Sequence, residues 1–262
     1  MKVFVAGASG VVGRRMVPML VDQGHQVWGT TRKAEREDAI AAAGAHPVVV
    51  DAFDGPALAE AVKRAAPDVV VHQLTDLSGT GTEANARLRI EGTRNLVDAA
   101  RAAGTGVMVA QSIAWLYAAG DGPAVETEPL DPGQRAYEGV AALEKAVAEM
   151  PRGVILRYGL LYGPGTWYAP DGRIAAGIRS GEYVPPASWG SFVHTDDAAA
   201  AAVAALDWPA GAVNIVDDHP TTDWPRAFGG TPQDGTPTGR PISNAKARAL
   251  GWHPAHPRLP LP

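Results

Sequence analysis

The chain has 262 residues, of which 46% are hydrophobic, and a formal net charge of −5. This length and composition suit one large domain, or one domain with a small appendage, and exclude a wholly disordered chain. The mildly acidic balance, with no basic run, argues against nucleic acid as a partner, and the absence of Cys excludes disulfides, zinc ribbons and thiol nucleophiles. The longest strictly apolar run, 198–206, is too short for a membrane helix, and glycine chemistry begins too early for a signal peptide. We therefore expect a soluble, cytoplasmic protein with no membrane partner.

Short runs of β-branched residues alternate with alanine-rich segments of helical length through the first two-thirds of the chain. The predicted strands are 2–6, 26–30, 46–50, 68–74, 106–111 and 153–158, and the predicted helices lie near 11–23, 34–43, 56–65, 83–103 and 135–149. This alternation predicts an α/β fold in which helices cover both faces of a parallel sheet. Such a sheet binds ligands beyond the carboxyl ends of its strands.

The character of the sequence changes after Tyr158, where Pro, Gly and Trp become more frequent. We expect a helix that begins at Thr195, a strand over 212–216 and a short helix near 243–250. The Thr195 side chain can cap its helix, and the two Asp residues that follow suit the positive end of the helix dipole. The remaining sequence predicts a small, irregular cap.

The strongest motif is the glycine run Gly7, Gly10 and Gly13, which follows the first predicted strand and opens the first helix. Gly7 allows the tight turn, Gly10 lets the backbone approach a pyrophosphate, and Gly13 lets helix and strand pack closely. The N-terminus of that helix offers free N–H groups and a positive dipole to phosphates. The motif predicts a Rossmann doubly wound sheet that binds a dinucleotide, with a purely structural turn as the alternative.

Residues at the end of the second strand select the cofactor. An NAD site usually places Asp or Glu there, whereas this chain has Thr31, Arg32 and Lys33, which suit the 2′-phosphate of NADP. We therefore predict NADP, with a solvated basic turn as the alternative. The other residues expected to contact the cofactor are Ser9, Val11, Val12, Asp51, Ala52, Gln73, Leu74, Gln111 and Gly159. The NADP-binding domain would span 1–160, with 191–217 returning to it, and the substrate-binding cap would span 161–190 and 218–262.

Five further segments, together with the glycine loop, carry a family resemblance. They are Glu-Gly-Thr-Arg-Asn-Leu at 91–96, Leu-Arg-Tyr at 156–158, Tyr-Gly-Pro-Gly at 162–165, Phe-Val-His-Thr-Asp-Asp at 192–197 and Asn-Ile-Val-Asp at 214–217. With them the chain resembles the extended short-chain dehydrogenases/reductases of the NAD-dependent epimerase/dehydratase family, over residues 2 to about 217 and again in 243–252. The resemblance implies the Rossmann fold and an enzyme that acts on nucleotide sugars, ketones or related carbonyl compounds with NAD(P).

The same resemblance implies a Ser or Thr after the fifth strand and a Tyr-x-x-x-Lys on the next helix, where the tyrosine exchanges a proton with the carbonyl oxygen. Ser112 fits the serine role. If Glu144 marks the family's glutamate on that helix, the tyrosine and lysine positions hold Ala136 and Val140. This register contains no proton donor.

If Tyr137 is the tyrosine instead, the lysine position holds Ala141. Arg89 stands where relatives often have an Asn that completes the proton relay. We keep Ser112 and Tyr137 as the candidate catalytic residues, without a lysine. The proton can then come from water or from the substrate itself, for example from a phenol beside the ketone; the third possibility is that no hydride is transferred.

Aromatic residues concentrate in loops expected near the carboxyl ends of the strands, where they suit a flat, apolar ligand better than a nucleotide diphosphate. The predicted substrate contacts are Trp115, Tyr117, Tyr162, Trp167 and His194. His253 and His256 lie among prolines without an evident carboxylate partner, so we predict no metal site.

Together these features predict an NADPH-dependent ketoreductase with a degenerate Ser-Tyr-Lys triad. Its substrate would be a bulky aromatic, polyketide-like ketone, of which an angucyclinone is one example. The alanine-rich, lysine-poor composition of the chain suits a protein of antibiotic biosynthesis. The alternatives are a nucleotide-sugar epimerase or dehydratase, and a non-catalytic NADP-binding sensor. The sequence leaves the oligomeric state, the stereochemistry and the acceptance of NAD open.

Overall fold

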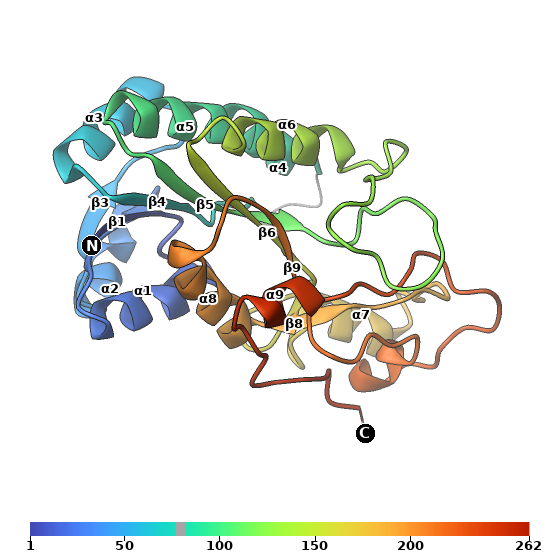
Figure 1. The fold of residues 1–262 in the computed structure, drawn as a ribbon. Helices are drawn as coiled ribbons and strands as arrows, with labels where there is room; N and C mark the ends of the chain where they lie inside the picture. Colours follow the sequence, from blue (N-terminus) through green and yellow to red (C-terminus); the bar gives the residue numbers. More distant parts are fainter. Residues whose placement is uncertain (77–81, 262) are drawn as a thin grey trace. The chain divides into compact units, whose positions relative to one another are not determined.

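The computed structural model describes residues 1–76 and 82–261. Its central sheet has seven strands in the order β3-β2-β1-β4-β5-β6-β9 (Figure 1). They are β1 (Lys2–Ala6), β2 (Gln26–Thr31), β3 (His46–Val49), β4 (Val69–His72), β5 (Val107–Ile113), β6 (Arg152–Tyr158) and β9 (Gly211–Ile215). The pairs β1–β2, β1–β4, β2–β3 and β4–β5 are parallel. The chain starts in the middle of the sheet and winds outward in both directions, so the predicted α/β, Rossmann doubly wound fold is confirmed.

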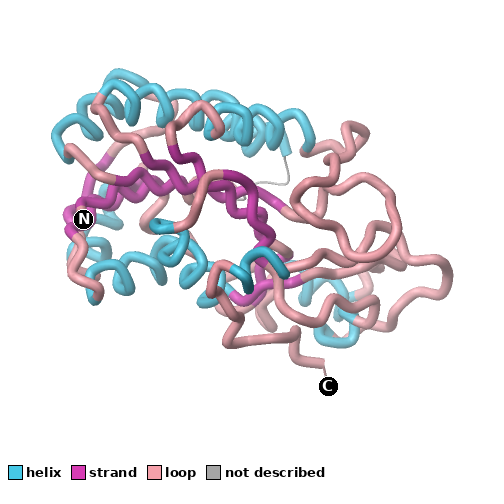
Figure 2. The backbone as a smooth tube through the Cα atoms, in the orientation of Figure 1, coloured by secondary structure: helices cyan, strands magenta, loops and turns pink. Residues whose placement is uncertain are grey.

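The helices follow the strands as the alternation predicted. They are α1 (Gly13–Asp22), α2 (Glu37–Ala42), α3 (Gly55–Ala65), α4 (Thr82–Arg87), α5 (Thr93–Ala102), α6 (Tyr137–Val147), α7 (Arg173–Ser180), α8 (Thr195–Ala204) and α9 (Ala245–Ala249). Figure 2 shows α1 and α2 on one side of the strands and α3, α5 and α6 on the other. The single helix predicted over 83–103 is divided by a π-helical turn, Leu88–Gly92, which separates α4 from α5.

The chain divides into two compact units. Unit 1 comprises Met1–Ser112, Gly133–Leu156 and Ala199–Ala212, and unit 2 comprises Ile113–Pro132, Arg157–Ala198 and Val213–Pro262. The main core of unit 1 lies between the strands and helices α3, α5 and α6. Phe4, Val70 and Met108 of the strands are fully buried there, against apolar side chains such as Leu96 and Leu143 of the helices. Burial of this kind stabilises the unit by roughly 25 cal/mol for each Å² of apolar surface removed from water.

Unit 2 contains a two-stranded parallel sheet that the sequence did not predict, β7 (Leu160–Tyr162) and β8 (Phe192–His194). Its core is aromatic. The Tyr168 ring meets the Phe192 ring edge-on at a centroid distance of 5.3 Å and the Trp224 ring at 6.0 Å, which is the favoured geometry for aromatic pairs. The partly buried Tyr168 side chain therefore packs against the aromatic core of unit 2.

The start of α8 differs from the prediction. Thr195 is the first residue of this helix, but its Oγ1 is buried and has no hydrogen-bond partner in the described part of the chain. The preceding residue fills the capping role instead, because Nδ1 of His194 accepts the N–H of Asp196 at 3.3 Å. The predicted cap was therefore wrong by one residue.

Across residues 1–76 and 82–261, every helix is too short or too polar to cross a bilayer.

Candidate cofactor and active site

The glycine loop of unit 1 is closed on one side and open on the other. Gly7 has a φ of +94°, and a Cβ there would lie 2.7 Å from the carbonyl oxygen of Gln73. A Cβ on Gly13 would collide with the carbonyl oxygen of Gly7. By contrast, a Cβ on Gly10 would approach only that same oxygen, at 3.2 Å. The free side of the loop therefore lies at Gly10, at the start of α1, where the first N–H groups of a helix lack intrahelical acceptors.

This geometry fits a bound pyrophosphate. The Gly10 N–H donates to the Gly7 carbonyl at 3.0 Å and fixes the turn. Ser9 precedes Gly10 in the loop, and Val11 and Val12 lie between Gly10 and the start of α1. A phosphate placed against Gly10 would meet backbone N–H groups and the positive end of the helix dipole without meeting a side chain at that position.

The end of β2 is organised around the Thr31 hydroxyl. Its Oγ1 accepts the N–H of Lys33 at 3.1 Å and the Ser9 hydroxyl at 3.3 Å. These bonds tie the end of the strand to the glycine loop. Thr31 is buried, so it positions the basic residues that follow it more than it presents its own hydroxyl.

Three cations surround this point. The Arg32 guanidinium is half exposed and pairs with Asp76 at 3.4 Å, and Lys33 is exposed. The sequence interpretation missed Arg36, in the short 3₁₀ turn after β2, whose Nη1 donates to both the carbonyl and the hydroxyl of Ser9 at 3.4 Å. A basic residue one turn beyond the strand end was the available signal.

Two of the predicted cofactor contacts, Asp51 and Ala52, follow β3. Asp51 is exposed, and its Oδ1 accepts the N–H of Phe53 at 2.9 Å. Ala52 is buried, and its carbonyl accepts the amide of Asn95 at 2.9 Å. The Asp51 carboxylate thus stabilises its own turn.

The end of β4 carries a buried histidine that the sequence interpretation did not single out. His72 is fully buried; its Nδ1 accepts the Leu74 N–H at 3.2 Å, so the neutral ring donates from Nε2 to Thr93 Oγ1 at 2.9 Å. Burial lowers the pKa of His72 to about 4, with a smaller contribution from the charge of Arg89. The neighbouring Gln73 is buried, and its N–H donates to Ala6 at 2.8 Å.

Ser112 lies at the end of β5 and is almost fully buried, next to the buried Gln111. Its hydroxyl donates to Oε1 of Glu144 on α6 at 2.7 Å. The helix therefore brings the glutamate, rather than a tyrosine, to the serine. A Ser112 hydroxyl held in this way still has lone pairs to accept a hydrogen bond, but it must leave Glu144 to donate one.

The two possible tyrosine registers differ in burial. Val140, the lysine position in the register set by Glu144, is fully buried against the core, and Ala136 stands at the N-cap of α6. Tyr137 is half-buried in the first turn of the helix, and Ala141 is one turn further on. Neither register supplies an ammonium group to activate a phenol.

The predicted substrate residues all lie in unit 2, and two of them serve its internal structure. The Tyr117 hydroxyl donates to Asn214 at 2.7 Å and accepts from Arg157 at 2.8 Å. Burial raises the pKa of Tyr117, against the opposing charge of Arg157. The Tyr162 hydroxyl donates to the carbonyl of Arg258 at 3.0 Å.

The other three are more accessible. Trp115 and Trp167 are exposed, and the Arg173 guanidinium lies 5.0 Å from the centre of the Trp167 ring. His194 is half-buried, with its ring 5.0 Å from that of Tyr162. Gly159, predicted at the cofactor, also lies in unit 2, where a Cβ would come within 2.5 Å of the Ser191 carbonyl.

The reason given for predicting no metal was wrong in one respect. His256 does have a carboxylate partner, because its Nδ1 lies 3.1 Å from Oδ2 of the buried Asp197. One ligand atom from each of His194, Asp196 and His256 also lies within 4.8 Å of the others. The Nδ1 of His194 is already used as the acceptor at the start of α8, and the prediction of no metal stays a prediction.

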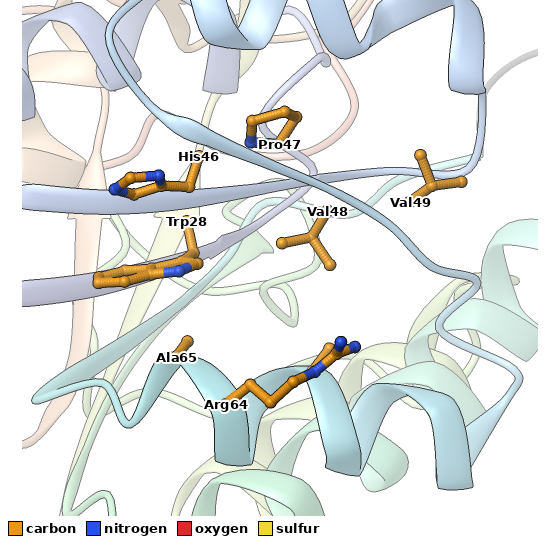
Figure 3. Close-up of a pocket in the computed structure, with 8 residues that line it drawn as sticks. Trp28, His46, Pro47, Val48, Val49, Arg64 and Ala65 are labelled. Atoms are coloured by element: carbon orange, nitrogen blue, oxygen red, sulfur yellow. The ribbon is translucent and has the colours of Figure 1, made fainter.

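A groove of about 360 Å³ opens at the β3 edge of unit 1 (Figure 3). The Trp28 and His46 rings lie side by side there, with centroids 5.0 Å apart. Its lining is Trp28, His46, Pro47, Val48, Val49, Ala61, Arg64 and Ala65. It contains none of the predicted site residues, so the candidate site stays at the glycine loop and the ends of β2, β4 and β5.

A doubly wound sheet with a glycine loop at the first strand–helix turn defines a nucleotide-binding α/β protein. The chain belongs to the NAD dependent epimerase/dehydratase family, whose model matches residues 3–216. The predicted family is thus confirmed.

Over its whole length the chain is similar to a 3-diazoavenalumate denitrifying reductase of a Streptomyces species, with 43% identity over 98% of this chain and 97% of that protein. It is also similar in structure to the UDP-glucose 4-epimerase of Thermus thermophilus in complex with NAD, with 25% identity, a TM-score of 0.78, and 97% and 94% of the two chains covered. The UDP-glucose 4-epimerase of Thermotoga maritima with UDP-glucose shares the fold, with 19% identity, a TM-score of 0.79, and 97% and 94% coverage.

Proposed function

We propose that this protein is an NADPH-dependent reductase that delivers hydride to a bulky aromatic substrate and leaves the proton to the substrate or to water. The proposal rests on helix α6, where Glu144 accepts a hydrogen bond from Ser112 and neither register contains a Tyr–Lys pair. The full-length similarity to a protein named as a reductase supports hydride transfer over a purely structural use of the cofactor.

The glycine loop supports a nicotinamide dinucleotide. Its open side at Gly10 fits a pyrophosphate, and the similar Thermus epimerase is a complex with NAD. Arg32, Lys33 and Arg36 support NADP over NAD, because guanidinium and ammonium groups bind a 2′-phosphate and no acidic residue occupies the ribose position. The reduced cofactor supplies a hydride when it is bound.

The first candidate substrate is an aromatic ketone with an adjacent phenol. Hydride adds to the carbonyl carbon, the C=O electron pair moves to oxygen, and the phenol proton passes to that oxygen. The protein then needs only to place the carbonyl carbon against the nicotinamide, which is the proximity term in catalysis. In lacking the tyrosine and the lysine, this chain also resembles the angucyclinone ketoreductase of simocyclinone biosynthesis. An angucyclinone is therefore the first ketone to test.

The second candidate is a diazo compound, favoured by the printed name of the 43% identical relative. Hydride adds to the terminal nitrogen of a diazonium-like group and gives a diazene, R–N=N–H. The N–H proton then leaves, N₂ departs while the carbon keeps the C–N electron pair, and a proton from solvent adds to that carbon, so that R–N₂⁺ and H⁻ give R–H and N₂ overall. No carbonyl oxygen has to be protonated in this reaction. An enzyme for it therefore has no use for a Tyr–Lys pair, which matches α6.

The test is to incubate the protein with NADPH and, separately, an angucyclinone with a phenol beside its ketone, the methyl ether of that compound, 3-diazoavenalumate, and UDP-glucose. We expect NADPH oxidation with the phenolic ketone or with the diazo compound, seen by absorbance and confirmed by product mass. The product of the diazo compound would have lost N₂ and gained hydrogen in its place.

Two outcomes contradict the proposal. Epimerisation of UDP-glucose would assign a nucleotide-sugar epimerase. Tight NADPH binding without oxidation by any of the four compounds would favour a non-catalytic sensor. The rates with the phenolic ketone and its methyl ether are compared at saturating substrate, with binding measured separately. Equal rates would exclude the phenol as the proton donor but would still be consistent with a reductase.

A further inference from the structure

Arg89 lies in the π-helical turn Leu88–Gly92, between α4 and α5. Its side chain is 8% exposed, unlike the neighbouring arginines on this helical run. Single π turns inside α-helices are frequent at functional sites, and the extra residue changes the direction in which the following side chains point. The turn therefore marks Arg89 as a residue placed inside the protein rather than on the solvent face of the helix.

The buried guanidinium has no counter-charge among residues 1–76 and 82–261. Arg87 pairs with Glu91 at 2.9 Å, and Arg94 and Arg101 pair with Glu149 at 2.8 and 3.1 Å. Arg89 makes no hydrogen bond or ion pair with any residue in these described ranges. Burial lowers its pKa to about 10, so it keeps its charge at neutral pH. A buried charge without a partner is costly for a fold, and it is retained where a ligand supplies the partner.

Contacts on either side of Arg89 place it beside the candidate active site. Three residues earlier, Ala86 packs against Gly139 on α6, where a Cβ on Gly139 would lie 3.1 Å from the Ala86 Cα. Four residues later, Thr93 bonds to His72 at the end of β4. The guanidinium is also close enough to His72 for its charge to lower the pKa of that ring.

The described groups around this cation leave it uncompensated. His72 is neutral, since its Nδ1 accepts the Leu74 N–H while its Nε2 donates to Thr93. On α6, Glu144 accepts the Ser112 hydroxyl. Arg89 therefore lies between the end of β4 and the first turns of α6, the region where the proposed reaction would develop negative charge.

We propose that the Arg89 guanidinium binds the substrate oxygen that becomes anionic as hydride arrives, a phenolate or alkoxide oxygen. This inference rests on the proposed function and names the group that takes over the electrostatic part of the missing Tyr–Lys pair. The ketone candidate produces such an oxygen at its carbonyl, and a diazo compound with a conjugated quinone-type carbonyl would produce one as a phenolate. A fixed cation stabilises that charge without having to transfer a proton.

The test measures binding to the NADP⁺-bound protein with two probes of similar shape. 4-Nitrophenol, at a mildly alkaline pH where it is the phenolate, carries the anionic oxygen, and nitrobenzene lacks it. Equilibrium dialysis with detection by absorbance gives both dissociation constants. The variants are Arg89→Gln, which removes the charge, Arg89→Lys, which keeps the charge without the planar fork, and Arg101→Gln, a matched control on the exposed face of α5.

We expect the parent to bind the phenolate more tightly than nitrobenzene by the roughly ten- to hundredfold typical of a charge-assisted hydrogen bond. Arg89→Gln should lose this preference, Arg89→Lys should keep part of it, and Arg101→Gln should keep all of it. Circular dichroism checks that each variant is folded.

A parent protein with no preference for the phenolate overturns the inference whether or not the variants fold. A preference that persists in folded Arg89→Gln does so too. The proposed function is tested separately by titrating the same protein preparations with NADPH. A parent protein that does not bind NADPH contradicts the proposed reductase, whereas a parent that binds NADPH but shows no phenolate preference contradicts only the role proposed for Arg89.

Discussion

Replacing His72 by Gln should remove a large part of the acid sensitivity of unit 1. In the folded protein the ring is fully buried and its pKa is lowered from 6.5 to about 4 by burial. Between these two values the unfolded chain binds a proton on this side chain and the folded chain does not. The contribution of His72 to stability is therefore complete above about pH 6.5 and is lost as the pH falls toward 4.

The gap between the two pKa values corresponds to about 3 kcal/mol of unfolding free energy. Gln keeps an N–H that can donate to Thr93 but does not titrate, so the variant should lose stability at neutral pH without this dependence. Urea unfolding followed by far-ultraviolet circular dichroism, at a series of pH values from about 7 to about 4, gives the difference between parent and variant. That difference should shrink by about 3 kcal/mol over the series; parallel curves would show that His72 does not resist protonation in the fold.

Four other outcomes follow from the structure. Asp217 has the opposite effect on stability, because burial and the charges of Asp218 and Asp197 raise its pKa to about 7. Its protonation therefore adds up to about 4 kcal/mol to the unfolding free energy as the pH falls from 7 toward 4. Asp217→Asn should abolish this gain in the same unfolding series. Gly10→Val should abolish NADP binding in calorimetry because its side chain fills the open face of the loop, while the folded control Gly106→Ala binds normally; normal binding by folded Gly10→Val would refute the assigned geometry. Arg32→Ala should reduce the preference for NADP over NAD by about tenfold. This is the low end for a charge-assisted contact, because Arg32 is half exposed and pairs with Asp76. Equal affinities of the parent protein for NADP and NAD would contradict the predicted cofactor. Tyr137→Phe should lower turnover by less than tenfold, or under about 1.4 kcal/mol, whereas a thousandfold loss in a folded variant that binds NADPH and substrate normally would make Tyr137 the acid.

Local signals in the sequence were sufficient for the strands of the central sheet and for the glycine loop. The strand Lys2–Ala6 was predicted with the bounds it has in the structure, and the first β-strand, tight turn and helix follow from one continuous stretch of chain. The same holds for the basic residues after β2, which are neighbours in sequence. In each case the interacting groups lie within a few residues of one another, where pattern is informative.

The features that the sequence did not predict depend on contacts between distant residues or on small changes of helical twist. Arginine side chains are rarely buried without a partner, so nothing in the sequence indicated the buried Arg89 in the π turn Leu88–Gly92. The strands β7 and β8 have three residues each and pair across about thirty positions of sequence. The partner of His256 is Asp197, which no spacing rule connects to it.

The candidate catalytic residues illustrate the same limit. The sequence showed that neither register has a lysine, because Val140 and Ala141 can be read directly at the two possible lysine positions. It did not show that Glu144 would hold the Ser112 hydroxyl at 2.7 Å, since that bond joins the end of a strand to the middle of a helix more than thirty residues away. The identity of the group opposite this candidate serine is decided by packing.

The order of synthesis gives the C-terminal segment a particular role. Every segment of unit 1 has been made once Ala212 is added. Unit 2 has not, because the buried carboxylate of Asp197 finds its backbone donors, the N–H groups of Ala255 and His256, only after a further forty residues have been translated. The Trp252 indole, which donates to the Asp197 carbonyl at 3.1 Å, arrives equally late. The segments that form the glycine loop and the strands beside it are therefore all translated well before the residues that complete the contacts of Asp197 in unit 2.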